Sequence, residues 1–132
     1  MKKIISFLFF VLMLGIAQAA FAQGENTTLR VGQQKTTAGG KVRVKLISVM
    51  EDSRCPTDVD CVWAGNAKVK VRVFVRGGET KTFELNTSGP DKAGQADAYR
   101  VQLESLTPGR KSNKNIRQRD YRVTFSINKL SR

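Results

Sequence analysis

Residues 68–75 read K-V-K-V-R-V-F-V, a strict alternation of valine with a cationic or aromatic side chain. Successive side chains of a β-strand point to opposite faces of a sheet, so this alternation predicts a half-buried strand whose valines face a core. The same pattern recurs at residues 42–46, 83–85, 101–103 and 121–127. No segment after residue 22 has the apolar period of an amphipathic helix. We therefore expect an all-β fold.

Turn-forming pairs separate these runs at Gly39-Gly40, Gly77-Gly78, Gly89-Pro90 and Pro108-Gly109. The third pair opens a polar loop that we expect to reach about Ala98. Short strands near residues 29–31 and after Cys61 bring the expected total to six or seven. This spacing favours an antiparallel β-sandwich, immunoglobulin-like as the first choice, or a small β-barrel. The strand order stays open, because an immunoglobulin disulfide joins strands that are far apart in sequence.

The chain begins with the three parts of a secretory signal peptide. Lys2 and Lys3 give a positive start, an apolar run covers residues 4–16, and A-x-A cleavage motifs follow at residues 17–19 and 20–22. An uncleaved membrane anchor is disfavoured, because a spanning helix needs about 20 apolar residues. We expect cleavage after residue 22, a single domain over residues 23–132 with no transmembrane segment, and a periplasmic or secreted location.

Cysteine and histidine usage limits the chemistry. Cys55 and Cys61 are the only two cysteines, and an oxidising compartment favours a disulfide between them. A thiolate nucleophile or half a metal site would lack any histidine or further cysteine to assist it. We therefore predict no metal and no cofactor.

An enzyme is not expected. Without histidine there is no Ser-His-Asp or Cys-His scheme, and no G-x-S-x-G or S-x-x-K motif frames a serine. A small carboxylate-dependent hydrolase is the remaining enzymatic alternative. It would need two acids facing each other across a cleft, and the sequence places none there.

The densest cluster of unusual residues is E-D-S-R-C-P-T-D-V-D-C-V-W-A-G-N at residues 51–66. Its D-S-R-C-P-x(4)-C-x-W-A-G pattern resembles a motif of small exported bacterial proteins of unknown function. The resemblance implies export and a disulfide, and it assigns no catalytic residue. The candidate binding residues of this segment are Arg54, Pro56, Asp58, Asp60 and Trp63.

Trp63, the only tryptophan, has two interpretations. It packs on the core beside the disulfide, or it is an exposed anchor on a loop stiffened by Pro56, the type of residue that dominates binding interfaces. The neighbouring acidic residues also have two interpretations. Asp58 and Asp60 form part of a Ca²⁺ site, or the loop is solvated and Asp52 or Asp58 pairs with Arg54. The second is favoured, because the spacing matches no EF-hand loop.

Positive charge dominates the surface: 23 Lys and Arg against 11 Asp and Glu give a formal charge of +12. If the valines point inward, the strand cations point outward, and a later loop adds more. The candidate anion-binding residues are Arg43, Lys45, Lys68, Lys70, Arg72, Arg110, Lys111, Lys114, Arg117 and Arg119. Such charges protect strand edges and keep a protein soluble. The functional alternative is a site for lipopolysaccharide, anionic lipid or an acidic polymer.

These observations favour a non-catalytic exported β-domain that binds a macromolecular or anionic envelope partner through a basic face and the cysteine loop. The alternative is a protease or hydrolase inhibitor that presents the loop from Cys55 to Cys61 to an active site, since a stiff loop lowers the ordering cost of binding. Nucleic acid is a disfavoured partner, because no aromatic strand is present on which bases would stack.

Overall fold

The computed structural model describes residues 24–130, so the predicted signal peptide lies outside the described residues. The all-β prediction is confirmed. The described chain forms eight strands and one short 3₁₀ turn: β1 (Glu25–Arg30), β2 (Gln34–Thr37), β3 (Val42–Asp52), β4 (Ala67–Val75), β5 (Thr80–Asn86), β6 (Ala93–Ala96), β7 (Tyr99–Thr107), η1 (Gln118–Asp120) and β8 (Arg122–Lys129).

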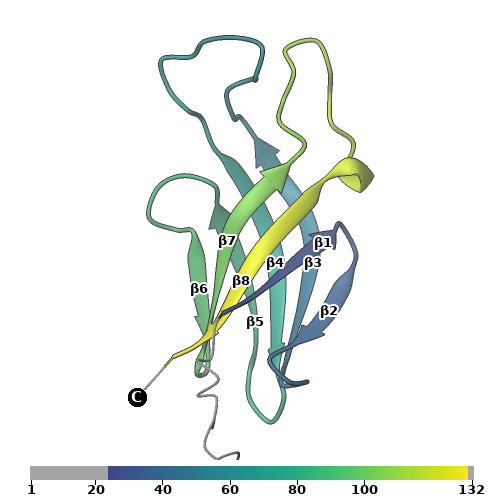
Figure 1. Cartoon of the computed structure of the whole chain (residues 1–132), viewed down its shortest axis with the longest axis vertical. Helices are drawn as coiled ribbons and strands as arrows, with labels where there is room; N and C mark the ends of the chain where they lie inside the picture. The colour runs from purple at the N-terminus through teal and green to yellow at the C-terminus, as the bar shows by residue number, and fades with distance from the viewer. Residues whose placement is uncertain (1–23, 131–132) are drawn as a thin grey trace, which may run out of the picture.

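The strands form two antiparallel sheets that pack as a sandwich (Figure 1), with the orders β1-β8-β7-β6 and β2-β3-β4-β5. The sheets do not close into a barrel, so the sandwich alternative is the one observed. In an immunoglobulin domain the chain crosses repeatedly between the sheets. Here β2 to β5 follow one another within one sheet, β6 to β8 follow one another in the other, and β1 returns beside β8.

Alternating valines build the core, as the pattern of residues 68–75 predicts. Val71, Val73 and Val75 are buried, whereas Arg72 and Phe74 between them are exposed. The opposite sheet contributes Phe125, which is fully buried. Two register shifts in β3, after Leu46 and after Val49, reverse which alternate residues face inward. Arg43 and Lys45 of β3 precede both shifts, and they share the outer face of the sheet with the basic side chains of β4.

Three details differ from the sequence prediction. The short strand expected after Cys61, ahead of the valine-rich strand, is wrong, because residues 61–66 form a loop and β4 begins at Ala67. The polar loop expected up to Ala98 contains β6, and β2 was not predicted. Both of these strands are four residues long and lie at sheet edges, where one buried side chain each, Thr37 and Ala96, leaves little apolar pattern to detect.

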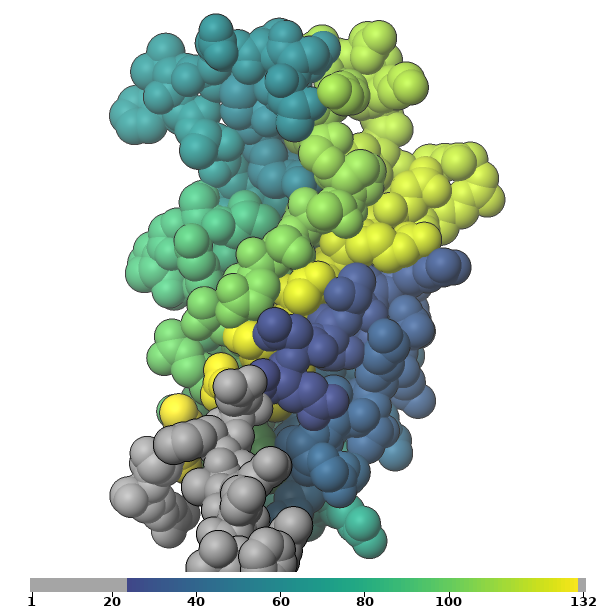
Figure 2. Space-filling view, in the orientation of Figure 1, coloured from purple at the N-terminus to yellow at the C-terminus, as the bar shows by residue number. Residues whose placement is uncertain are grey.

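Two long loops lie side by side at one end of the sandwich (Figures 1 and 2). We call residues 53–66, between β3 and β4, the stapled loop, and residues 108–121, between β7 and β8, the late loop. Hydrogen bonds join Thr57 of the first to Arg110 of the second, and Ser112 of the second to Asp58 of the first. The candidate residues of the cysteine segment and the late cations are therefore neighbours in space.

Candidate functional site

The predicted disulfide is present. Cys55 and Cys61 are bonded, with their Cα atoms 5.9 Å apart. The base of the loop is closed by the backbone amide of Cys55, which donates to the carbonyl of Ala64 at 2.9 Å, and by that of Ser53, which donates to Asn66 at 2.7 Å. The stapled loop is thus cross-linked covalently and by backbone hydrogen bonds.

Arg54 holds the stapled loop on the sandwich. Its Nε and Nη2 donate to the two carboxylate oxygens of Asp52, each at 2.8 Å. Its Nη1 and Nη2 also donate to the carbonyls of Leu106 at 2.7 Å and Pro108 at 2.9 Å. The two paired side chains are only 16% and 9% exposed. Of the two partners predicted for Arg54, Asp52 and Asp58, the structure shows Asp52, and this pair occupies Arg54 within the fold.

Tyr121 completes this network from the start of the last strand region. Its hydroxyl donates to Asp52 Oδ2 at 2.8 Å. Burial raises the pKa of Asp52, but the hydrogen bonds from Arg54 and Tyr121 outweigh burial and leave that pKa below its ordinary value. Burial, together with the adjacent carboxylate, raises the pKa of Tyr121 to about 12. The carboxylate and the phenol therefore act as a fixed acceptor and donor at neutral pH.

The late loop braces the stapled loop from one side. The backbone carbonyl of Arg110 accepts a hydrogen bond from the backbone amide of Thr57 at 2.8 Å. The side-chain Nη1 of Arg110 donates to the carbonyl of Arg54 at 2.7 Å. Ser112 donates through its amide at 3.0 Å and its hydroxyl at 2.6 Å to the carboxylate of Asp58. These hydrogen bonds lower the pKa of Asp58. Arg110 and Asp58, both candidate binding residues, thus have structural partners.

The loop between β5 and β6 contacts the stapled loop from another side. The Ser88 hydroxyl donates to the carbonyl of Gly65 at 2.9 Å, and the side-chain Nδ2 of Asn66 donates to Oδ1 of Asn86 at 2.8 Å. Gly65 has a φ of +72°, and a Cβ there would collide with the backbone of Ser53 and Arg54. Only glycine fits this close crossing of two backbone segments.

The outer end of the stapled loop is apolar and exposed. Val62 is 92% exposed and Trp63 is 82% exposed. The interpretation that Trp63 packs on the core is therefore wrong, because the side chain is exposed as the anchor interpretation requires. Val59 is 45% exposed, and Asp60, which lies between Val59 and Val62 in the sequence, is exposed as well. Two adjacent solvent-exposed hydrophobic residues thus stand on a loop that is fastened at its base.

The strand cations lie together on the outer face of the β2-β3-β4-β5 sheet. Lys45 of β3 is directly opposite Arg72 of β4, and Arg43 is opposite Phe74. The other two predicted members of this face, Lys68 and Lys70, lie further along β4 toward the stapled loop. We call this set the basic face: Arg43, Lys45, Lys68, Lys70 and Arg72.

The late-loop cations form a separate group. Arg117 pairs with Asp120 at 2.9 Å, and Arg110 is bound to the stapled loop. Lys111, Lys114 and Arg119 are exposed and form no ion pair within residues 24–130. The ten cations that the sequence nominates therefore belong to two surfaces, the basic face and the late loop.

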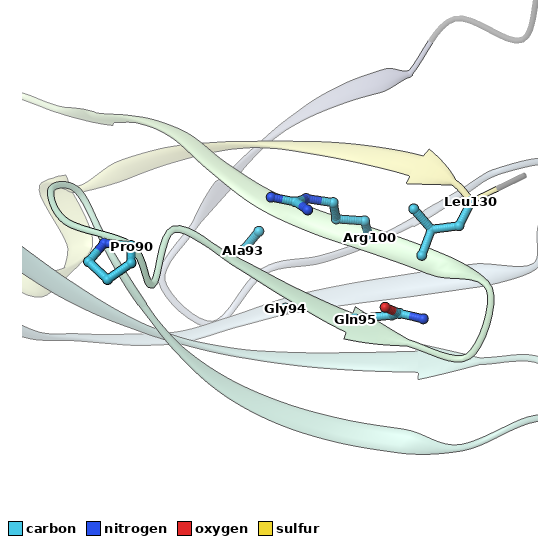
Figure 3. A pocket seen from close by; sticks show the side chains of 6 residues that line it. All are labelled: Pro90, Ala93, Gly94, Gln95, Arg100 and Leu130. Atoms are coloured by element: carbon cyan, nitrogen blue, oxygen red, sulfur yellow. The ribbon is translucent and has the colours of Figure 1, made fainter.

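Shallow hollows on the described surface include three that lie near candidate residues or edge strands. One, of about 220 Å³, lies on the basic face and is lined by Gln34, Arg43, Lys45, Arg72, Phe74 and Thr80. A second, of about 210 Å³, lies beside β6 and β7 (Figure 3), with Arg100 as its only charged residue. A third, of about 360 Å³, lies within the late loop. None of the three brings two carboxylates together.

Within residues 24–130, no three Cys, Asp or Glu side chains converge as metal ligands would. In the same part of the chain, no helix has the length and apolar character needed to cross a bilayer. Comparison of the chain with protein-family models, curated proteins and solved structures found no match.

Proposed function

We propose that the protein is an exported, non-catalytic binding domain that acts in the periplasm or outside the cell. Its stapled loop docks on a macromolecular partner of the envelope, and the basic surfaces add electrostatic attraction. The single observation that carries this proposal is the exposure of Val62 and Trp63, at 92% and 82%, on a braced loop.

Leaving these two side chains exposed forgoes the stability that their burial would contribute to the fold. Fully burying a large apolar side chain stabilises a protein by roughly 1.5–3 kcal/mol, and Trp63 forgoes most of that gain. Meanwhile the disulfide, Arg54, Ser88 and Arg110 fix the backbone beneath it. A loop held in one conformation loses little entropy on binding, which favours an anchor residue that enters a pocket.

A protein with an apolar pocket fits this tip better than a lipid surface does. Asp60, three residues before Trp63 on the same loop, is exposed, and an anionic bilayer would repel its carboxylate. Shallow insertion into lipid also gains nothing from a rigid backbone. An inhibitor is the special case in which the pocket is the active site of a hydrolase.

The proposal can be tested by photo-crosslinking. A benzoylphenylalanine in place of Val62, adjacent to Trp63, should form a discrete protein adduct in the envelope of expressing cells, whereas the same substitution at Met50, a 44% exposed residue of β3, should not. The purified partner is then titrated. Because Trp63 is the only tryptophan, its fluorescence should shift to shorter wavelength as the partner buries it.

Trp63→Ala should weaken binding to that partner by roughly 30-fold or more, as loss of an interface hot spot does. Its melting temperature should stay unchanged, since the side chain has few contacts to lose. Met50→Ala is the matched control and should bind normally. Absence of an adduct at residue 62, or an affinity within twofold of wild type for Trp63→Ala, would refute the proposal. If the partner is a hydrolase, its inhibition should be lost in the same variant.

A further inference from the structure

The basic face carries its charge unevenly. Toward the stapled loop, Lys70 is opposite Glu84 of β5 and Lys68 is opposite Glu51 of β3, so each has an acid within its row. Toward the other end, the partners of Lys45 are Gln34 and Arg72. The unbalanced part of the face is therefore confined to two neighbouring rows.

Those two rows place three cations around one hollow. Lys45 and Arg72 are directly opposite each other on adjacent strands, and Arg43 lies one row away on the same face. The ion pairs of residues 24–130 include none of the three. Like charges at directly opposite positions destabilise a sheet. This arrangement works against folding, and a bound anion would relieve the repulsion.

The remaining lining of the hollow is neutral and suited to sugars. The Arg43 guanidinium lies 5.6 Å from the centroid of the Phe74 ring, and 41% of Phe74 stays exposed. Gln34 on one side and Thr80 on the other supply an amide and a hydroxyl at the rim of this depression of about 220 Å³. An aromatic surface with hydroxyl and amide groups contacts the apolar face and the hydroxyls of a sugar ring, while cations bind its acidic groups.

We propose that this hollow binds an acidic polysaccharide. Arg43, Lys45 and Arg72 bind the carboxylate or sulfate groups of the polymer, Phe74 contacts a sugar ring, and Gln34 and Thr80 bind its hydroxyls. The site is separate from the tip of the stapled loop.

Two other polyanions fit the hollow less well. A single-stranded nucleic acid needs a series of aromatic platforms, whereas this face offers one ring, partly covered by Arg43. A lipid surface would require apolar side chains that insert into the bilayer, and the hollow has cations at its centre and polar groups at its rim.

The first experiment measures binding of the full domain to polygalacturonate and to heparin, the carboxylate and sulfate arms, by calorimetry at several salt concentrations. Neutral dextran, a single-stranded DNA oligomer and anionic phosphatidylglycerol vesicles are the comparison ligands. We expect binding to at least one acidic polysaccharide that weakens as salt rises, and no binding to dextran. Tighter binding of the DNA or the vesicles than of both polysaccharides would overturn the proposal.

Substitutions then locate the site. The double variant Lys45→Gln/Arg72→Gln should weaken polysaccharide binding by roughly tenfold or more. The melting temperature of this variant should stay the same or rise, because the repulsion between the two cations is removed. Arg30→Gln/Arg100→Gln changes the net charge equally at two exposed positions of the other sheet and should bind nearly as well as wild type. An equal loss in both double variants would indicate a general charge effect and overturn the proposal.

Two further variants separate charge from shape and from the stapled loop. Phe74→Ala removes no charge and should also weaken binding, whereas Lys45→Arg/Arg72→Lys should retain it. Trp63→Ala should bind polysaccharide normally, so failure of this inference and failure of the proposed function give different results. Normal binding by Phe74→Ala would overturn the role of the ring and reduce the hollow to a patch of charge.

Discussion

Replacing Arg54 by methionine tests whether the stapled loop is held by its buried ion pair. Methionine keeps the length and apolar stem of the side chain but removes all its donors. Asp52, whose side chain is 9% exposed, would keep only the hydroxyl of Tyr121 at 2.8 Å and the backbone amide of residue 54 at 3.4 Å. The carbonyls of Leu106 and Pro108 would lose their donors as well.

The expected loss follows from that burial. Removing one partner of a buried ion pair costs about 3–5 kcal/mol, because the remaining charge has lost its compensation. Both side chains here are less than one-fifth exposed, at 16% and 9%, so solvent screening reduces this figure little. A small domain has only about 5–15 kcal/mol of stability. The variant should therefore lose a large fraction of its free energy of unfolding.

Urea unfolding followed by far-ultraviolet circular dichroism measures this loss. Tryptophan fluorescence would be a poor probe, since Trp63 is already exposed in the folded state. The control is the double variant Asp52→Asn/Arg54→Met, which removes the orphaned charge and should recover part of the stability. A loss below about 1 kcal/mol, typical of a surface pair, or a double variant no more stable than the single one, would refute the reasoning.

The pH dependence gives a second reading of the same pair. The pKa of Asp52 is lowered in the folded state, so its contribution to stability is complete above the ordinary pKa of about 3.9 and is lost as the pH falls through the folded value. In Arg54→Met the pKa of Asp52 should rise. The variant should then lose less stability than wild type between neutral and acid pH.

Two other predictions concern the same end of the molecule. An ultraviolet titration should show the Tyr121 phenol ionising near pH 12. The contribution of this phenol to stability should be complete below about pH 10 and should be lost as the pH rises through its folded pKa of about 12. A Tyr121→Phe variant whose titration keeps the step near pH 12 would contradict the assignment. Gly65→Ala should cost about 1–3 kcal/mol more than Gly32→Ala, because both glycines have positive φ but only a Cβ at residue 65 meets backbone. Equal melting temperatures for the two variants would show that the crossing at Gly65 is loose.

The sheet core was predictable because burial in a strand follows a local rule. Val69, Val71 and Val73 alternate with polar neighbours, and that period is enough to assign their face. β6 was not predicted because it is short and its packing depends on another strand rather than on its own apolar pattern. Gly94 lies so close to the Phe83 ring of β5 that a Cβ there would overlap it. Nothing in the sequence around residue 94 specifies that contact.

The candidate site was predictable only in part, for the same reason. The two cysteines have a single possible pairing, and the Asp52–Arg54 pair is local, so both were within reach of sequence reasoning. Tyr121 reaches Asp52 across 69 residues, which requires the strand register. Apolar character suggests burial of Trp63, but exposure depends on the direction that the loop takes from its braces.

The pairing of β1 with β8 has a consequence for how the domain is made. Leu29 lies opposite Val123, so the first strand has no partner until the last one exists. The sheet of β2 to β5 consists of consecutive hairpins and needs only local contacts, which form fastest. A nascent chain that has not yet released residues 122–129 therefore presents β1 and β7 as open edges, which attract other chains. The first strand to be synthesised is thus the one whose hydrogen bonds form last.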